Sequence, residues 1–373
     1  MACGAGSHQG PDSKGDRATS FLDRFRSFFR RQPAATSEPA PPAKPGLARG
    51  RVDHVIILDG TLASLKAEHI GNAGILYLLL HEMGARANRR LYYDPGMQWQ
   101  GWWRSLALLE GSGVAPQIRR AYGWLASGYR PGDRIFLFGY SRGAYAVRSL
   151  AGVIDRVGLL RRDLATERMV TQAWRHYEAG TTGQAARDFA DGHCHPGVQI
   201  EMVGVWDTVK ALGLPLARLV ARDRHGFHNH QLGPSVRHGY HALALDETRV
   251  VLEPVLWDCP PDWQGNVQQV WFRGAHADIG GQLGTMDSAR PLANIPLVWM
   301  LDRAETLGLA LPEGWRERHP CDASAPMVGT WSGWGKLFLW RRRRVPGRDR
   351  SESLHPSAVD TAAGRWPSVP ATD

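Results

Sequence analysis

Residues 134–145 read RIFLFGYSRGAY, an apolar run that passes directly into a Gly-Tyr-Ser-Arg-Gly turn. The run at 135–138 has the length of a buried strand, and the small residues that follow Ser141 indicate a helix ending near Ile154. A serine held at the tip of a strand-to-helix turn is the pattern of a nucleophile elbow, in which Gly139 and Gly143 allow close backbone packing. Glycine and serine are common, so the five-residue pattern alone is weak and the flanking strand and helix carry the prediction.

Apolar runs of strand length alternate with helical patterns through the middle of the chain. We expect strands at residues 55–58, 90–93, 134–138, 200–206 and 267–272, and further helices at about 71–84, 114–128, 163–188 and 293–308. Such alternation is typical of a mostly parallel sheet covered by helices on both faces. The sequence predicts one α/β domain over residues 51–360, with disordered tails at 1–50 and 361–373.

The formal net charge of +9 is concentrated near the two ends of the chain. Residues 1–51 hold nine basic and four acidic side chains, and residues 341–350 hold six and one, whereas the stretch between them is nearly neutral. A nucleic-acid-binding protein would carry its basic groups on a patterned face, so we do not expect nucleic acid as a partner. Hydrophobic residues make up 43% of the chain, and no apolar run has the length needed to span a bilayer.

Aromatic residues lie beside both basic stretches. Phe21, Phe25 and Phe28 follow helical spacing with arginines between them, and Trp331, Trp334 and Trp340 precede the four arginines at 341–344. Both segments fit peripheral contact with an anionic membrane, because aromatic rings suit the lipid–water boundary and arginines attract headgroups. A transient helix in the first case and core packing in the second are the alternatives. Trp99, Trp102 and Trp103 form another aromatic cluster, with the same alternatives.

Two later strands end in groups that would activate a serine. Asp207 directly follows the strand at 200–206, and His276 comes shortly after the strand at 267–272. The carboxyl ends of parallel strands share one edge of a sheet, and the order Ser, Asp, His is that of α/β-hydrolases. We therefore predict Ser141 as nucleophile, His276 as base and Asp207 as acid. Asp278 is a rival acid, although its position two residues from His276 suits it better to holding its own loop.

The first strand ends in Asp59-Gly60-Thr61, which resembles part of a phosphatase signature. The attacking aspartate of that signature is replaced by Ile57, which cannot form an aspartyl-phosphate, so this reading fails. The loop follows a strand of the same sheet, and we expect Gly60 or Thr61 to donate an N–H to an oxyanion. The second donor would be the N–H of Arg142 at the helix N-terminus.

The four cysteines have neither disulfide density nor CxxC spacing. His193-Cys194-His195 is a conceivable ligand cluster, but adjacent residues rarely all face one ion, so a polar loop is the better interpretation. We expect no metal and no organic cofactor. The oligomeric state is not predicted.

As a set, these residues resemble the catalytic domain of type VI secretion phospholipase effectors of the Tle group, a bacterial α/β-hydrolase family. The shared stretches are Asp59-Gly60-Thr61, Tyr92-Tyr93-Asp94-Pro95-Gly96, the elbow around Ser141, Gly204-Val205-Trp206-Asp207-Thr208, Ala244-Leu245-Asp246-Glu247, Val270-Trp271-Phe272 with Gly274 and His276, and Leu354-His355-Pro356-Ser357. The resemblance implies hydrolysis of acyl esters, typically of phospholipids, by Ser141, Asp207 and His276. No segment resembles a cleavable signal peptide, so we expect the chain in the cytoplasm of the producing cell, and export by a type VI-like route or peripheral association with a membrane are the alternatives.

Two other functions fit the same sequence. One is a soluble carboxylesterase that acts on short acyl chains, and the other is a catalytically silent scaffold that binds lipid or protein through its basic ends. Interfacial activation distinguishes the first from a phospholipase, and labelling of Ser141 by a fluorophosphonate distinguishes the second.

Overall fold

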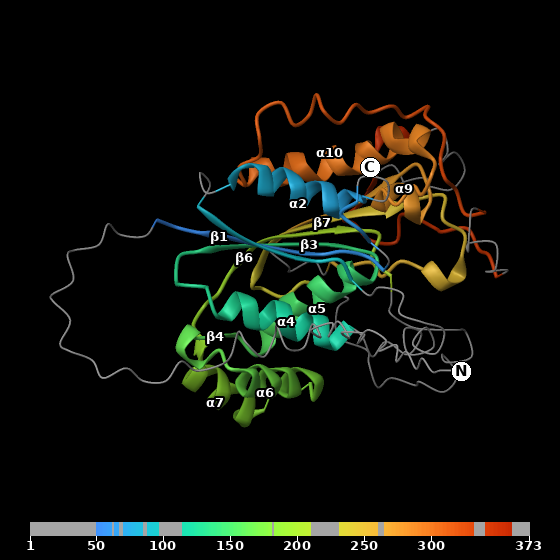
Figure 1. Cartoon of the computed structure of the whole chain (residues 1–373). Helices are drawn as coiled ribbons and strands as arrows, with labels where there is room; N and C mark the ends of the chain where they lie inside the picture. The colour runs from blue at the N-terminus through green and yellow to red at the C-terminus, as the bar shows by residue number, and fades with distance from the viewer. Residues whose placement is uncertain are drawn as a thin grey trace, which may run out of the picture. The chain divides into compact units, whose positions relative to one another are not determined.

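Seven strands form one sheet in the computed structural model, and all neighbouring strands run parallel (Figure 1). Their order across the sheet is β2-β1-β3-β6-β7-β8-β9. The bounds are β1 (Asp53–Leu58), β2 (Arg89–Asp94), β3 (Arg134–Tyr140), β6 (Ile200–Trp206), β7 (Val236–Ala244), β8 (Asn266–Phe272) and β9 (Glu352–Leu354). Two short strands, β4 (Leu159–Leu160) and β5 (Cys194–His195), pair antiparallel with each other. The structure describes residues 50–61, 63–66, 70–84, 88–96, 114–180, 183–209, 231–259, 265–331 and 340–359.

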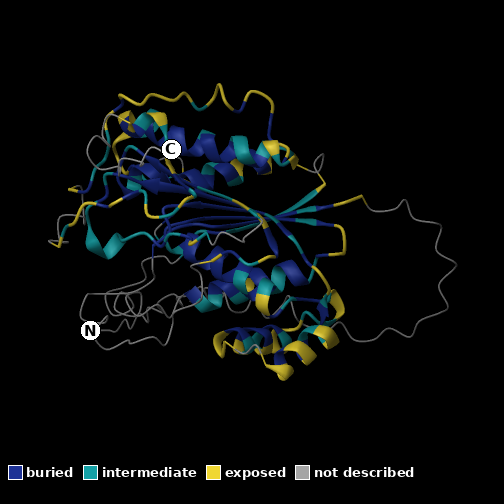
Figure 2. Cartoon of the chain, turned by 180° about the vertical axis from the view of Figure 1, so that it is seen from behind, coloured by how far each residue is buried: buried dark blue, intermediate teal, exposed yellow. Residues whose placement is uncertain are grey.

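Helices cover both faces of the sheet (Figure 1). One face carries α2 (Asn72–Glu82), α9 (His276–Gly280) and α10 (Arg290–Thr306), and the other carries α4 (Val114–Ala126) and α5 (Arg142–Arg156). Outside these lie α6 (Glu167–Glu178), which packs against α4 and α5, and α7 (Gln184–His193). Figure 2 shows the sheet mostly in dark blue, because its residues are buried. On the side of the sheet covered by α4 and α5, most of the yellow, exposed residues belong to the outer helices α6 and α7.

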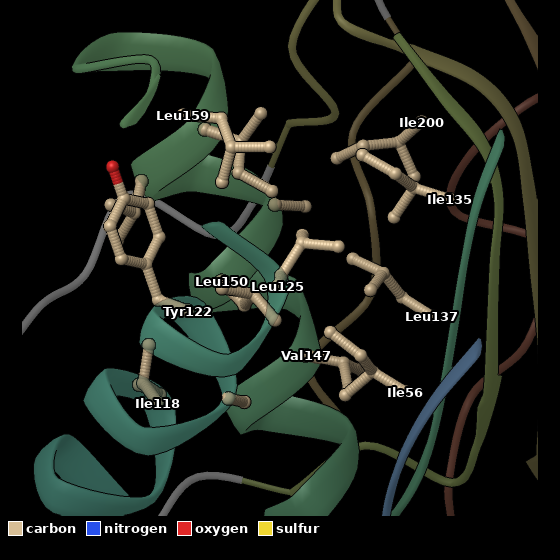
Figure 3. Close-up of a cluster of buried hydrophobic side chains, with 14 of the residues drawn as sticks. Ile56, Ile118, Tyr122, Leu125, Ile135, Leu137, Val147, Leu150, Leu159 and Ile200 are labelled. Atoms are coloured by element: carbon tan, nitrogen blue, oxygen red, sulfur yellow. The ribbon is translucent and has the colours of Figure 1, made fainter. Parts of the chain in front are cut away.

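Alternating side chains of each central strand supply the two cores. Ile56 and Leu137 point toward α4 and α5, whereas Ile57 and Phe138 point toward α2 and α10. This period of two follows from the pleat of a strand, and burial on both faces explains why these strands read as continuous apolar runs. Figure 3 shows the first core, where strand residues meet Ile118, Tyr122 and Leu125 of α4 and Val147 and Leu150 of α5.

The predicted α/β fold, with a mostly parallel sheet and helices on both faces, is confirmed. The expected helix at 163–188 is instead two helices, because Gly180 and Gly183 fall between α6 and α7. The prediction missed β7, whose sequence VRHGYHALA carries two histidines and a glycine in place of an apolar run. It also missed β9, which has three residues.

Several expected features fall outside the described residues. These are the tails, apart from Gly50 at the inner limit of the first, the Phe/Arg segment at 21–31, and Trp99, Trp102, Trp103 and Trp334. The described residues belong to a unit that begins at Gly50, and the proposed domain limits stay a prediction. No helix in these described ranges is both long and apolar enough to span a bilayer.

The order in which the chain adds strands to the sheet changes side between β1 and β3, although all strands point the same way. β2 lies on one side of β1, and β3 and the later strands lie on the other. Ligands of open α/β sheets bind beyond the carboxyl ends of the strands at such a switch point. The residues at these ends are Asp59 after β1 and Ser141 after β3.

A Cβ atom at Gly143 would collide with the carbonyl oxygens of Leu58 and Asp59. We expect Gly143→Ala to lower the free energy of unfolding by at least about 2 kcal/mol, because backbone at the end of β1 must move to admit the methyl group. Gly123 in α4 is the matched control, since a Cβ there lies 3.4 Å from Val170. Gly123→Ala should be neutral or stabilising by up to about 1 kcal/mol in urea unfolding. Equal midpoints for the two variants would contradict the close approach of α5 to β1.

Candidate active site

Ser141 occupies a strained turn between β3 and α5. Its backbone has φ 57° and ψ −121°, a region that side-chain-bearing residues rarely adopt. The turn is held because the Ser141 N–H donates to the Trp206 carbonyl at 3.0 Å. It also needs small neighbours, since a Cβ on Gly139 would come within 2.6 Å of the Gly143 carbonyl oxygen. Ser141 therefore lies at the tip of a tight strand-to-helix turn, which is the backbone geometry that a nucleophile elbow requires, and its role as nucleophile stays a prediction.

The three residues expected to cooperate lie in one chain of hydrogen bonds. His276 Nε2 is 2.9 Å from Ser141 Oγ, and His276 Nδ1 is 2.6 Å from Asp207 Oδ2. Asp207 is completely buried, whereas Ser141 and His276 are each 8% exposed. A neutral imidazole that donates from Nδ1 to the carboxylate leaves Nε2 as an acceptor for the serine proton. The arrangement can therefore deprotonate Ser141 during an attack.

The register of the sheet brings Asp207 beside Ser141. Tyr140 pairs with Trp206 in the ladder between β3 and β6, so the residues that follow them lie side by side. Asp207 has φ 39°, and its N–H donates to the Ala242 carbonyl at 2.8 Å. Ser141 and Asp207 are the two non-glycine residues with positive φ in the described part of the chain. Backbone strain is thus concentrated at this site.

Asp207 has a partner that the sequence did not indicate. Arg344 donates to Oδ1 at 2.6 Å and to Oδ2 at 3.0 Å, and the Ala244 N–H donates to Oδ1 at 3.0 Å. Burial favours the neutral acid, but the Arg344 charge and the His276 hydrogen bond outweigh it and hold the pKa of Asp207 well below its usual range. The sequence predicts that Arg344, with the other arginines at 341–344, attracts anionic headgroups. In the structure Arg344 is instead buried.

Two other residues missed by the sequence prediction hold His276. The Tyr140 ring packs on the imidazole, with 4.9 Å between centroids, and the Tyr140 hydroxyl donates to the His276 carbonyl at 3.1 Å. The His276 N–H donates to Glu247, which is itself paired with Arg249. Burial would raise the pKa of Glu247, but Arg249 outweighs that effect and lowers it. Tyr140 lies inside the Gly139–Gly143 motif, and Glu247 lies in one of the stretches shared with the family. These positions in the sequence were the available signal that both residues lie near the site.

Asp278, the rival acid, serves its own loop. Its carboxylate accepts the N–H groups of Ala275, Val328 and Gly329 at 2.8, 2.7 and 3.3 Å. Burial raises the pKa of Asp278, although these amides oppose the shift. It forms no hydrogen bond to the His276 ring in the described structure. Asp278 therefore fixes the turn that carries His276.

We expected one of two amides in the loop after β1, at Gly60 or at Thr61, to donate to an oxyanion. The Gly60 N–H donates to Asp59 Oδ1 at 2.7 Å and is therefore already engaged. Gly60 is needed for a different reason, because a Cβ there would lie 2.7 Å from the Tyr140 ring. The Thr61 amide has no acceptor among the described residues, and the Arg142 side chain donates to the Thr61 hydroxyl. Thr61 and the first amide of α5, at Arg142, are the better oxyanion candidates.

The described residues contain no group of three His, Cys, Asp or Glu side chains that could hold a metal ion. His193 ends α7, and Cys194 and His195 form β5, so the three residues of the conceivable ligand cluster belong to regular structure.

The chain was also compared with known protein families and with curated proteins. The family model described as T6SS, Phospholipase effector Tle1-like, catalytic domain matches residues 53–303. The uncharacterized protein YEL023C of Saccharomyces cerevisiae is 32% identical over 221 residues, which cover 52% of this chain and 31% of the yeast protein.

Two solved structures are similar over most of the chain. One is a crystal structure of an uncharacterized protein from Pseudomonas aeruginosa, with TM-score 0.39 and 16% identity, covering 71% of this chain and 47% of that one. The other is the Tle1 effector bound to the VgrG spike of the type 6 secretion system, with TM-score 0.36 and 18% identity, covering 74% and 57%. The chain thus spans about a third of the yeast relative and about half of the two solved chains.

Asp59 generates a prediction about pH and stability. Burial raises its pKa from 3.8 to about 6, against the hydrogen bonds from Gly60 and Tyr93. The folded state then binds more protons than the unfolded state between these pKa values, so this group contributes stability at low pH that is lost as pH rises through about 6.

In Asp59→Asn the side chain stays neutral, and the Tyr93 hydroxyl can turn to accept from the amide. We expect the difference in unfolding free energy between variant and wild type to move in favour of Asn by about 2 kcal/mol from about pH 4.5 to about pH 7.5. Urea unfolding at several pH values measures it. A difference that stays constant with pH would show that Asp59 does not titrate in this way.

Proposed function

Because the chain belongs to the family of Tle1-like catalytic domains of type VI secretion phospholipase effectors, we propose that it is a serine hydrolase that cleaves acyl esters of phospholipids. The observation that carries the proposal is the continuous hydrogen-bonded path from Ser141 Oγ through the His276 imidazole to the buried Asp207 carboxylate. An alcohol near its free pKa is a poor nucleophile, and this path supplies the base that makes it reactive.

The proposed reaction has two steps. Ser141 Oγ attacks the ester carbonyl while His276 Nε2 takes the hydroxyl proton, which it then gives to the leaving alcohol. A water molecule next attacks the acyl-enzyme while His276 Nε2 takes its proton. The bond between Ser141 Oγ and the acyl carbon then breaks, His276 returns the proton to Ser141 Oγ, and the fatty acid leaves. Asp207 keeps its negative charge throughout, holds the Nδ1 tautomer and stabilises the imidazolium.

The tetrahedral intermediate places negative charge on the former carbonyl oxygen. The Arg142 N–H at the start of α5 and the Thr61 N–H are the donors we propose for that oxygen, since the Gly60 amide is engaged by Asp59. Tyr140, Glu247 and Asp278 then act indirectly by fixing His276 and its turn. No step requires a cofactor.

An exposed aromatic edge near the C-terminal basic run supports the proposal of a lipid substrate. Trp331 and Trp340 are 60% and 69% exposed, and Arg342 and Arg343 are exposed beside Trp340. The guanidinium carbon of Arg341 lies 3.5 Å from the centre of the Trp331 ring. Exposed indole rings with adjacent guanidinium groups suit a lipid–water boundary, so we propose that this edge contacts anionic membrane peripherally. The edge is smaller than the sequence indicated, because Arg344 and the Arg341 head group point into the protein.

Export is a separate proposal that rests on family membership. Delivery through a type VI secretion system is typical of the effectors for which the family is described, and we propose the same route for this chain. The yeast relative extends the likeness beyond bacteria. The proposed chemistry is the same for an exported effector and for a hydrolase that stays in the cell that makes it.

Ser141→Ala tests the reaction. We expect it to lower release of labelled fatty acid from phospholipid vesicles by at least about a thousandfold, because the nucleophile is removed. Labelling at each acyl position in turn shows which ester is cleaved. The variant should keep the circular dichroism and melting temperature of the wild type and should not react with a fluorophosphonate. Hydrolysis at the wild-type rate would overturn the assignment.

The same assay separates the alternatives. Turnover that peaks on dissolved short-chain esters and does not rise at an interface would favour a soluble carboxylesterase. A folded wild-type chain that neither hydrolyses esters nor reacts with a fluorophosphonate would favour a silent scaffold.

Replacing Trp331 and Trp340 together by Ser tests the membrane edge. We expect binding to phosphatidylglycerol vesicles to weaken at least about threefold, since each indole would otherwise bury apolar area in the interface. Leu78→Ser on α2 is the control, because Leu78 is also an exposed apolar residue, at 44%. Vesicle sedimentation measures both. Unchanged binding of the double variant would leave the tryptophans without this role.

A further inference from the structure

A buried arginine from a distant part of the chain grips the carboxylate of Asp207. Arg344 lies 137 residues further along the sequence, and its two terminal nitrogens reach both carboxylate oxygens, at 2.6 and 3.0 Å. The side chain is 6% exposed and that of Asp207 is completely buried. A planar fork that engages both oxygens fixes the rotation of the carboxyl group, which a single point charge does not.

Arg344 is itself held in place by backbone groups. Nη1 donates to the Ala244 carbonyl at 2.8 Å, and Nη2 donates to the carbonyl of Leu252, at the end of the turn η4 (Val250–Leu252). Ala244 ends β7 and also donates its own N–H to Asp207. The guanidinium therefore ties the acid to the two segments that flank it.

The segment that carries Arg344 is anchored on both sides. Before it, the Trp340 carbonyl accepts the Val250 N–H, and the Arg342 N–H donates to the Thr248 carbonyl at 2.7 Å. After it, the Glu352 carboxylate accepts the N–H groups of residues 347–349, and β9 pairs with β8. The family match ends at residue 303, so this support comes from a part of the chain beyond it.

These contacts have a consequence for the proposed reaction. An ionised carboxylate without a counter-charge is costly to bury, and a buried acid beside an imidazole tends to take up a proton instead. We infer that Arg344 is a positioning residue for Asp207: its two-pronged contact keeps the carboxylate ionised and aims Oδ2 at His276 Nδ1 while the imidazolium forms. The inference rests on the proposed hydrolase function.

A purely structural ion pair would affect stability alone, whereas a charge that keeps Asp207 ionised must also affect the pH dependence of the reaction. The Arg344 guanidinium lowers the pKa of the Asp207 carboxyl group. Without it, Asp207 should take up a proton at a higher pH and no longer support His276, so activity on the acid side should be lost at a higher pH. The other charged or titratable groups that face this centre are Asp59 after β1, Tyr140 in β3, Arg148 in α5, His241 in β7, and Glu247 and Arg249 after β7. None of these changes in the variants below.

The test compares Arg344→Met, Arg344→Lys and Arg348→Met in the full chain, with p-nitrophenyl butyrate as a soluble substrate. We expect Arg344→Met to lower kcat/KM about tenfold and to move the acid limb of its pH profile up by about one pH unit. Arg344→Lys keeps the charge but loses the fork, so kcat/KM should fall severalfold while the acid limb stays in place. Arg348 is an exposed arginine of the same segment, and Arg348→Met should match the wild type.

A second measurement covers poor folding of these variants. Arg344→Ala opens space for a guanidinium, so added methylguanidinium should restore activity at least about threefold, whereas methylammonium should restore less. A wild-type acid limb in folded Arg344→Met, or rescue by neither cation in folded Arg344→Ala, would overturn the role of Arg344. A wild-type chain without esterase activity would overturn the proposed function instead, and the inference with it.

Discussion

The alignment of parallel strands at one edge is the constraint on which the rest of the molecule depends. The carboxyl ends of β1, β3, β6 and β8 deliver the Asp59 loop, Ser141, Asp207 and the turn before His276 to that edge. Backbone register therefore aligns Ser141 with Asp207, whereas His276 is held by the turn after β8. A shift of one residue in one ladder would turn the aligned side chain to the opposite face of the sheet.

The same edge of the sheet also holds features that lower the stability of the folded state. Strained φ values at Ser141 and Asp207, a wholly buried carboxylate and the raised pKa of Asp59 lie within three adjoining strand ends. The apolar cores on the two faces of the sheet stabilise the fold enough to tolerate them. Such a distribution is expected where a rigid scaffold holds a site in a conformation that the chain would not adopt by itself.

The parts visible in the sequence are those with local patterns. Apolar runs predicted β1, β3, β6 and β8, and the residues following them gave Ser141, Asp207 and His276. β7 was missed because it is central yet carries His238, Gly239 and His241. Arg344 was missed because nothing within the basic run distinguishes it from its neighbours. Arg344 is buried because β9 pairs with β8 and the backbone at 340–342 bonds to residues 248–250. These contacts join residues far apart in the sequence, so no local pattern reveals them.

The late position of Arg344 has a consequence for the order in which the site is made. A ribosome synthesises Ser141, Asp207 and His276 well before Arg344, and a growing chain folds from its N-terminus. Until the segment from 340 to 354 docks on β8 and on residues 248–250, the Asp207 carboxylate is without its counter-charge. Docking of Arg344 on Asp207 then coincides with β9 joining the sheet, so a nascent chain contains Ser141 and His276 before the Asp207 carboxylate has its counter-charge.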